Sequence, residues 1–194
     1  MLLVKPEQAM TRALSAGISF FQYRNKRATR KTIYETARLL SSVAHQSHAL
    51  FIVNDHADIA EAVDADGVHL GQDDLPIEQA RKILGSGKII GISTHSREQA
   101  MAAERSGADY IGFGPIFPTT TKDAGELQGI NTLKIVKSAV GIPLIAIGGI
   151  TQKNIGDVIR SGADGAAVIS AILSSDDITL ASHEMMTVIA KLTR

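Results

Sequence analysis

Two basic side chains and an amide follow the second strand that the sequence predicts. Because side chains alternate along a strand, Gln22, Arg24 and Lys26 share one face with Ile18 and Phe20. The two apolar residues mark that face as inward-facing, where cations would have no hydrocarbon partner. The pattern therefore favours a bound anion. The alternative is a strand end that simply carries Arg and Lys into solvent.

Acidic side chains end the next two predicted strands. Asp55 follows Asn54, and Asp74 follows Asp73. Two carboxylates near a phosphate suit Mg²⁺, which takes one or two carboxylates together with water and phosphate oxygens. The alternative is that each Asp caps the following helix, and the position of Asp73 and Asp74 just before Pro76 favours a cap for one of them.

A serine ends the fifth predicted strand. Ser93 could donate a hydrogen bond to a phosphate or to a substrate nitrogen, whereas Thr94 or Ser96 is better placed to cap the next helix. The six histidines show no metal-ligand spacing. We therefore interpret His69 and His95 as structural residues with satisfied hydrogen bonds.

One long loop, residues 114–129, follows the sixth predicted strand. Three hydroxyls and a cation stand together in it, at Thr119, Thr120, Thr121 and Lys122. This group predicts a phosphate clamp or a lid, and its alternative is a solvated threonine-rich turn.

A second anion site is expected after the last two strands, at Gly149, Ile169 and Ser170. Parallel barrels frequently bind phosphate there through backbone N–H groups, and glycine lets a ligand approach the backbone closely. Two anion sites across one mouth indicate two phosphorylated substrates, or one substrate with two phosphate ends.

Short aliphatic segments alternate with helical patterns and would position these residues. Four times a helix-like segment ends in small residues and a strand follows at once. Strands are expected at 2–4, 18–23, 49–53, 68–70, 88–92, 110–113, 143–147 and 165–169. The clearest helices are expected at 29–46, 77–84, 97–105 and 153–160. Eight strand–helix units predict a single (β/α)8 TIM-barrel domain over 1–194, with an abbreviated first strand. A flavodoxin-like open sheet, with about five strands, is the alternative.

The overall composition excludes several classes of protein. The 194 residues carry no net charge, so no global field attracts nucleic acid or an anionic membrane. Cysteine is absent, which excludes disulfides and thiolate metal sites. Without an apolar leader or a long apolar run, we expect a soluble cytoplasmic protein.

These motifs together resemble the thiamine-phosphate synthase family. The resemblance is carried in order by Gln-x-Arg-x-Lys, Asn-Asp, Ala-Asp-Gly-Val-His-Leu-Gly-Gln-x-Asp, Gly-Pro-Ile-Phe-Pro-Thr-x-Thr-Lys and Ala-Ile-Gly-Gly-Ile. It extends over essentially the whole chain. It implies a barrel that joins hydroxymethylpyrimidine diphosphate to a thiazole phosphate, giving thiamine phosphate and diphosphate with Mg²⁺.

The resemblance also implies a role for each matched residue. Gln22, Arg24 and Lys26 would bind the diphosphate, and Asp55 and Asp74 would bind the metal. Further contacts to the pyrimidine substrate would come from Asn54, Ser93 and Lys122. The thiazole phosphate would meet Thr119, Thr120, Thr121, Gly149, Ile169 and Ser170. Arg24, Lys26, Ser93 and Lys122 are the expected catalytic groups.

Two features depart from the family pattern. Lys5 stands where an acidic residue is usual, beside the abbreviated first strand, and the segment between Lys122 and Gly129 is short. The first departure indicates an altered barrel edge or a start codon placed too late. Two other functions remain open: a thiazole tautomerase-like barrel, and a sensor that binds thiamine phosphate without catalysis. Neither has an evident need for diphosphate and metal groups.

Overall fold

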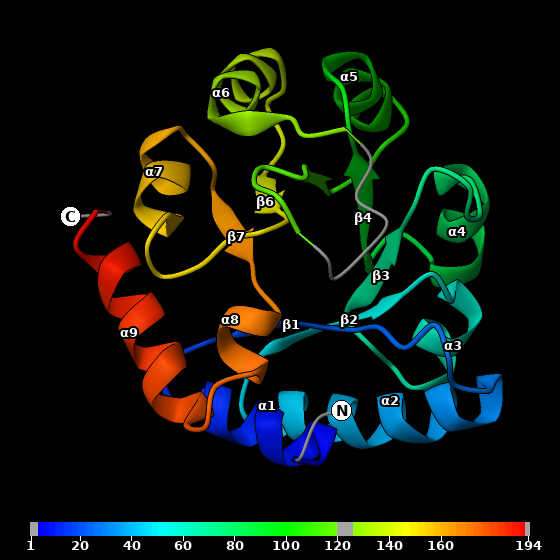
Figure 1. Ribbon diagram of the computed structural model, residues 1–194. Coiled ribbons are helices and arrows are strands. Elements are labelled where there is room, and N and C mark those ends of the chain that lie inside the picture. Colours follow the sequence, from blue (N-terminus) through cyan, green and yellow to red (C-terminus); the bar gives the residue numbers. More distant parts are fainter. Residues whose placement is uncertain (1–3, 120–125, 193–194) are drawn as a thin grey trace.

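Seven parallel strands form one curled sheet in the computed structural model, which describes residues 4–119 and 126–192 (Figure 1). The strands are β1 (Phe20–Tyr23), β2 (Leu50–Asn54), β3 (Gly67–Leu70), β4 (Ile89–Thr94), β5 (Tyr110–Phe113), β6 (Leu144–Ile147) and β7 (Gly165–Ala167). Their order in the sheet equals their order in the chain. A flavodoxin-like sheet reverses its strand order at a switch point, so that alternative is wrong.

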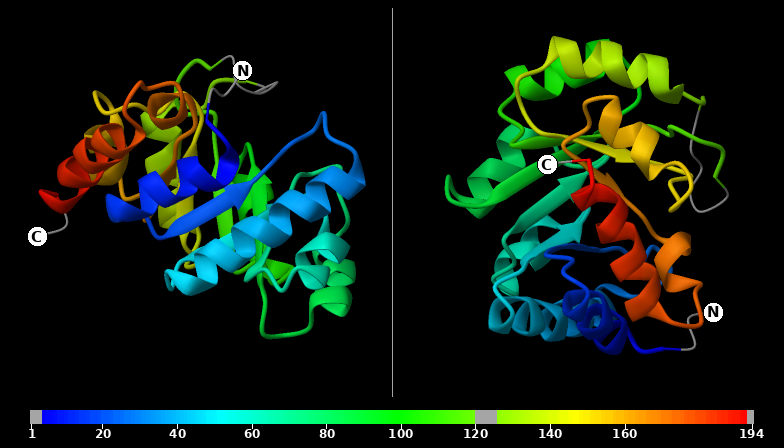
Figure 2. Two further views of the ribbon diagram at one scale, coloured as in Figure 1. Left: turned by 90° about the horizontal axis from the view of Figure 1, so that it is seen from below. Right: turned by 90° about the vertical axis from the view of Figure 1, so that its left-hand side faces the viewer.

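Helices cover the outside of the curled sheet, and the strands lie within their ring (Figure 1). They are α1 (Pro6–Ser15), α2 (Arg30–Gln46), α3 (Ala57–Ala62), α4 (Ile77–Leu84), α5 (Arg97–Arg105), α6 (Gly129–Ala139), α7 (Ile155–Arg160), α8 (Ser170–Leu173) and α9 (Ile178–Ala190). In both views of Figure 2, α9 lies along the outside of the molecule. It packs against α1, α7 and α8.

The first predicted strand, residues 2–4, falls largely outside the described residues, and Val4 lies in a bend. The structure therefore has a TIM-barrel-like half-barrel of seven strands, and closure by an eighth stays a prediction. Among the described residues, none of the helices combines the length and the apolar character needed to cross a bilayer.

Side-chain caps mark the starts of some helices and not of others. The Ser96 hydroxyl accepts the Gln99 N–H at the start of α5, as predicted. At α4, however, the N-cap is Pro76 and no side chain caps the helix. The expectation that Asp73 or Asp74 caps α4 is therefore wrong, because Leu75 and Pro76 separate both from the helix start.

The strand register divides the sheet into two chemically different faces. The outer face packs on the helices through large apolar side chains, among them Phe51, Val68, Ile90, Ile111, Phe113 and Leu144. The inner face carries polar side chains, two aromatic rings, glycines and several aliphatic side chains. From the paired positions its members are Phe20, Gln22, Leu50, Ile52, Asn54, Gly67, His69, Ile89, Gly91, Ser93, Tyr110, Gly112, Ile145, Ile147, Gly165 and Ala167. Fold stability thus comes mainly from the outer face, while the inner face is free for chemistry.

A repeated aspartate fixes the N-terminal end of the sheet. The carboxylates of Asp66, Asp109 and Asp164 accept backbone N–H groups of the preceding strands, each at 2.7 Å. These aspartates belong to the small-residue turns that recur in the sequence. Charge-assisted hydrogen bonds therefore join neighbouring strands at this end of the sheet, away from the strand ends that carry the candidate site.

Candidate active site

A chain of hydrogen bonds crosses the inner face of the sheet. The Tyr110 hydroxyl contacts His69 Nδ1 at 2.8 Å, and His69 Nε2 contacts Ser93 Oγ at 2.9 Å. Gln22 lies close enough to the same tyrosine to lower its pKa. Burial raises the pKa of Tyr110 far above its usual value, although the Gln22 contact opposes the shift. Tyr110 therefore stays protonated, and its hydroxyl gives this series of hydrogen bonds a fixed hydrogen-bond donor.

The tyrosine ring fits because the paired position on the neighbouring strand, Gly91, has no side chain. A Cβ atom on Gly91 would lie 2.1 Å from Tyr110 Cζ, which no side chain can do. The ring also meets Phe20 edge to face, with centroids 5.6 Å apart. This part of the inner face, here called the chamber, combines the aromatic pair Phe20 and Tyr110 with the hydrogen-bonded side chains of His69 and Ser93.

Two carboxyl groups face each other at the mouth of this chamber. Asp55 follows β2 with a φ of +65°, a backbone conformation that non-glycine residues rarely adopt. Burial raises the pKa of Asp55, and the hydrogen bond and negative charge of Asp74 raise it further. Asp74 also accepts the Gly71 N–H at 2.6 Å. Two carboxylates this close repel unless a proton or a cation lies between them.

Cationic groups border the carboxyl pair. Lys26 Nζ lies 3.7 Å from Asp55 Oδ2, and both Lys26 and Arg24 lower the pKa of Asp55. A cavity of about 280 Å³ opens beside them. It is lined by Tyr23, Arg24, Asn25, Lys26, Ala28, Arg30, Ile33, Asn54, Asp55 and His56. This arrangement can hold an anion next to a divalent cation.

The opposite side of the mouth is built from backbone. Gly149 has a φ of +64°, and a Cβ atom there would lie 2.5 Å from the Pro118 carbonyl oxygen. The loop after β5 thus packs directly on the turn after β6. Ile169 and Ser170 follow β7 at the start of α8, and both are exposed.

The structure brings most of the predicted residues to one end of the sheet. Gln22, Asn54 and Ser93 lie on the inner face near the strand ends, while Arg24, Lys26, Asp55 and Asp74 follow the strands. Thr119 is described and half-buried, whereas Thr120, Thr121 and Lys122 lie outside the described residues. Asp55 does not cap α3, whose N-cap is His56 without a side-chain hydrogen bond. The alternative that Asp55 caps the following helix is therefore wrong.

Sequence reasoning missed three residues of the chamber. His69 has satisfied hydrogen bonds, as predicted, but it also faces the chamber. Tyr110 was assigned only to a strand, and Gln72 was passed over although its amide donates to the Ser93 carbonyl at 2.7 Å. The alternation of side chains along a strand was the available signal for Tyr110. It places Tyr110 on the same face of the strand as Gly112, which is the inner face.

Comparison with known proteins agrees with this geometry. The family model of thiamine monophosphate synthase matches residues 4–172. This chain belongs to that family. A thiamine-phosphate synthase from Methanosarcina barkeri is 51% identical over 169 residues, which cover 86% of this chain and 76% of the relative. One from Chloroflexus aurantiacus is 45% identical over 179 residues, covering 92% and 82%.

A solved structure supports the same family. Thiamine phosphate pyrophosphorylase from Pyrococcus furiosus superposes with a TM-score of 0.93 at 40% sequence identity, covering 99% of this chain and 93% of that protein. The match to the thiamine monophosphate synthase family therefore includes the sheet and every described strand end that carries a candidate residue.

Proposed function

We propose that this protein is a Mg²⁺-dependent transferase that makes thiamine phosphate. It would join 4-amino-2-methyl-5-hydroxymethylpyrimidine diphosphate to 4-methyl-5-(2-hydroxyethyl)thiazole phosphate and release diphosphate. One observation carries the proposal: the Asp55–Asp74 carboxyl pair lies beside Arg24 and Lys26 at the mouth of a polar chamber. Membership of the family supports the same reaction.

The chamber suits a planar heterocycle with hydrogen-bonding edges. If Gln22 donates to the Tyr110 oxygen, the Tyr110 proton goes to His69 Nδ1, and His69 Nε2–H then donates to Ser93 Oγ. The Ser93 proton is left to donate to a ring nitrogen of the pyrimidine. Ser93 would therefore orient the substrate, together with Asn54, which is paired with His69 on the same face of the sheet.

The chemistry requires charge stabilisation more than proton transfer. The bond from the pyrimidine methylene carbon to the diphosphate oxygen breaks, and the oxygen keeps the electron pair. The lone pair of the thiazole nitrogen then forms the new bond to that carbon. Arg24 and Lys26, with Lys122 of the long loop, would stabilise the charge that grows on the departing diphosphate.

Asp55 and Asp74 fit a magnesium site. Hard carboxylate oxygens are the ligands that Mg²⁺ prefers, and the mutual repulsion of this pair is relieved by a cation. Bound Mg²⁺ would supply Lewis-acid stabilisation of the diphosphate oxygens. The described residues form no group of three His, Cys, Asp or Glu side chains that could hold a metal, so the substrate would provide further ligands.

The thiazole phosphate would bind across the mouth, at the backbone side. Gly149 is partly exposed and Ile169 and Ser170 are exposed there, and Thr119, Thr120 and Thr121 belong to the adjoining loop. Separate binding sites for two phosphorylated substrates also explain why one side of the mouth is cationic and the other is built from backbone. Closure of the sheet by an eighth strand is part of the same proposal.

The purified protein incubated with both substrates tests the function. Release of diphosphate and formation of thiamine phosphate, abolished by a chelator and restored by Mg²⁺, are the expected results. Binding of thiamine phosphate without any turnover would favour the sensor. Isomerisation of a thiazole carboxylate phosphate without coupling would favour the tautomerase.

A further inference from the structure

His95 reaches from the end of one strand to the loop that follows the next. It comes directly after β4, and its Nδ1 contacts the Gly114 carbonyl oxygen at 2.6 Å. Its own backbone N–H donates to Gln99 Oε1 at 2.7 Å, which fixes the residue on the first turn of α5. Because a carbonyl can only accept, Nδ1 carries the hydrogen in this contact.

Gly114 begins the long loop, and the residues that follow it are hydrogen-bonded to the end of β6. The Ile116 N–H donates to the Ile147 carbonyl at 2.9 Å, and the Phe117 N–H donates to Gly148 at 3.1 Å. The loop base is therefore held from both sides, by His95 and a backbone bond from the Gly114 N–H to the Thr94 carbonyl on the β4 side, and by backbone on the β6 side.

The position of this base decides the shape of the backbone side of the mouth, here called the backbone wall. Gly149 lies against the Phe117 and Pro118 carbonyls, so a shift of the loop base also shifts the wall that Gly149 helps to form. His95 itself lies on the other side of Gly114. Its side chain acts on the wall through the Gly114 carbonyl.

We propose that His95 is a positioning residue for the thiazole-phosphate side of the mouth. This inference rests on the proposed function, because it assigns that substrate to the backbone wall. Most of the diphosphate side, including the carboxyl pair, Arg24 and Lys26, follows β1 to β3, whereas the His95 contact joins the end of β4 to the loop that also carries Lys122. Loss of the Nδ1 hydrogen bond should therefore impair thiazole phosphate much more than pyrimidine diphosphate.

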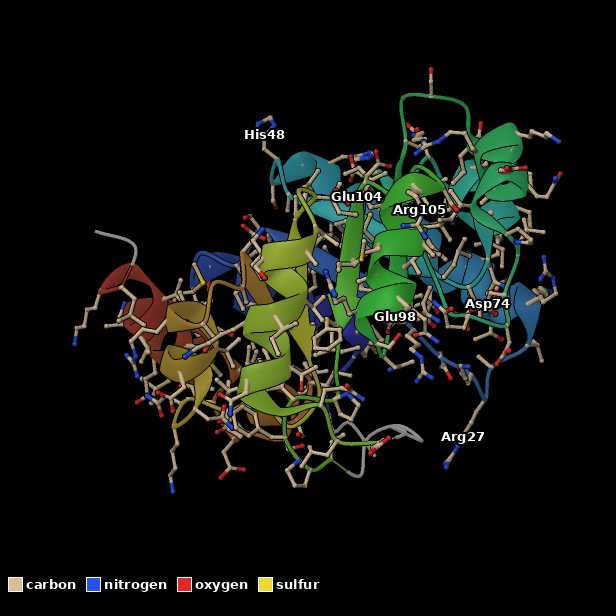
Figure 3. All side chains as sticks on the ribbon, turned by 90° about the horizontal axis from the view of Figure 1, so that it is seen from above. Arg27, His48, Asp74, Glu98, Glu104 and Arg105 are labelled. Carbon is tan, nitrogen blue, oxygen red and sulfur yellow. The ribbon has the colours of Figure 1, made fainter. Side chains whose placement is uncertain are left out.

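An asparagine can test the hydrogen bond separately from the imidazole ring. The Asn amide nitrogen is two bonds from Cβ, as Nδ1 is in histidine, so His95→Asn retains the donor. His95→Ala removes it. His48→Asn is the matched control, because His48 is exposed at the opposite end of the molecule from Arg27 and the strand ends (Figure 3).

Steady-state kinetics with each substrate varied in turn give the readout. His95→Ala should raise the KM for thiazole phosphate up to about tenfold, the usual effect of one hydrogen bond, and leave the KM for pyrimidine diphosphate within about twofold. His95→Asn and His48→Asn should both stay near wild type. If the alanine variant does not fold, His95→Gln, whose amide is one bond further out, replaces it.

Three results would overturn the inference. They are an unchanged KM for thiazole phosphate in the folded Ala or Gln variant, an equal rise for both substrates, and an asparagine variant as impaired as alanine. A wild-type protein without coupling activity would instead refute the proposed function, so the two failures are distinguishable.

Discussion

Arg24 should contribute more to the chemical step than to substrate binding. It follows β1, is partly buried, and lies close enough to Asp55 to lower the pKa of that carboxyl. A preorganised cation facing the departing diphosphate gains interaction energy as the bond to carbon breaks. Loss of one such donor typically costs about 100- to 1000-fold in turnover, equivalent to about 2.7–4 kcal/mol.

The structure also indicates which of the two cations, Arg24 or Lys26, should contribute more to the rate. The Lys26 side chain is 58% exposed, so water and salt screen its charge, whereas Arg24 is less exposed. Arg24→Ala should therefore lower the single-turnover rate by the full 100- to 1000-fold, and Lys26→Ala by less. Arg24→Lys should also be poor, since a point charge cannot copy the planar fork that grips two phosphate oxygens.

Rapid-quench single-turnover measurement at saturating substrates is the assay. Arg27→Ala is the control, because Arg27 projects from the tip of the same loop into solvent (Figure 3). Arg24→Ala should leave the fold intact, since Phe21 and Tyr23 keep their packing on the outer face. A folded Arg24→Ala protein with near wild-type coupling would refute the reasoning, and the tautomerase or sensor would then be favoured.

Activity should require Mg²⁺ through Asp55 and Asp74; either Asp→Asn change should raise the Mg²⁺ concentration needed, and full wild-type activity in chelator would contradict this. The raised pKa of Asp55 means that the pair takes up a proton more readily as the pH falls, so the acid limb of the pH–rate profile should move to lower pH as Mg²⁺ is increased. At the other end of the barrel, burial alone would raise the pKa of Asp164, but hydrogen bonds from Lys137 and the Leu144 N–H lower it. A lowered folded-state pKa stabilises the fold above the unfolded pKa, and that stabilisation is lost as the pH falls through the folded value. Asp164→Asn should therefore lower the free energy of unfolding by about 1 kcal/mol at pH 7, which corresponds to a fall of about 2–4 °C in Tm. The difference from wild type should be smaller below about pH 4, and kcat should be unchanged. Equal destabilisation at pH 3 and pH 7 would contradict this prediction.

The fold could be predicted largely from local pattern. Each strand is short and aliphatic and follows small residues, so β3 and β5 were placed to within one residue. The sequence could not establish the closure of the barrel, because closure depends on pairing between distant strands. The sequential order of the seven strands agrees with the predicted barrel.

The charged part of the site was predictable for a different reason. Asp55, Asp74, Arg24 and Lys26 follow strands, and parallel strands bring their carboxyl ends to one edge. The chamber was not predicted, because the roles of Tyr110 and its partners depend on register across three strands. A tyrosine inside an apolar segment resembles any core residue until its neighbours across the sheet are known.

The contact between Gly91 and the Tyr110 ring has an evolutionary consequence. The ring occupies the space that any side chain at position 91 would need. Substitution at 91 would therefore have to be accompanied by a smaller residue at 110, and the Tyr110 hydroxyl would be lost with it. Positions 91 and 110 should accordingly vary together or not at all among homologues, and a natural sequence with a larger residue at 91 should mark a descendant that has exchanged the pyrimidine for another ligand.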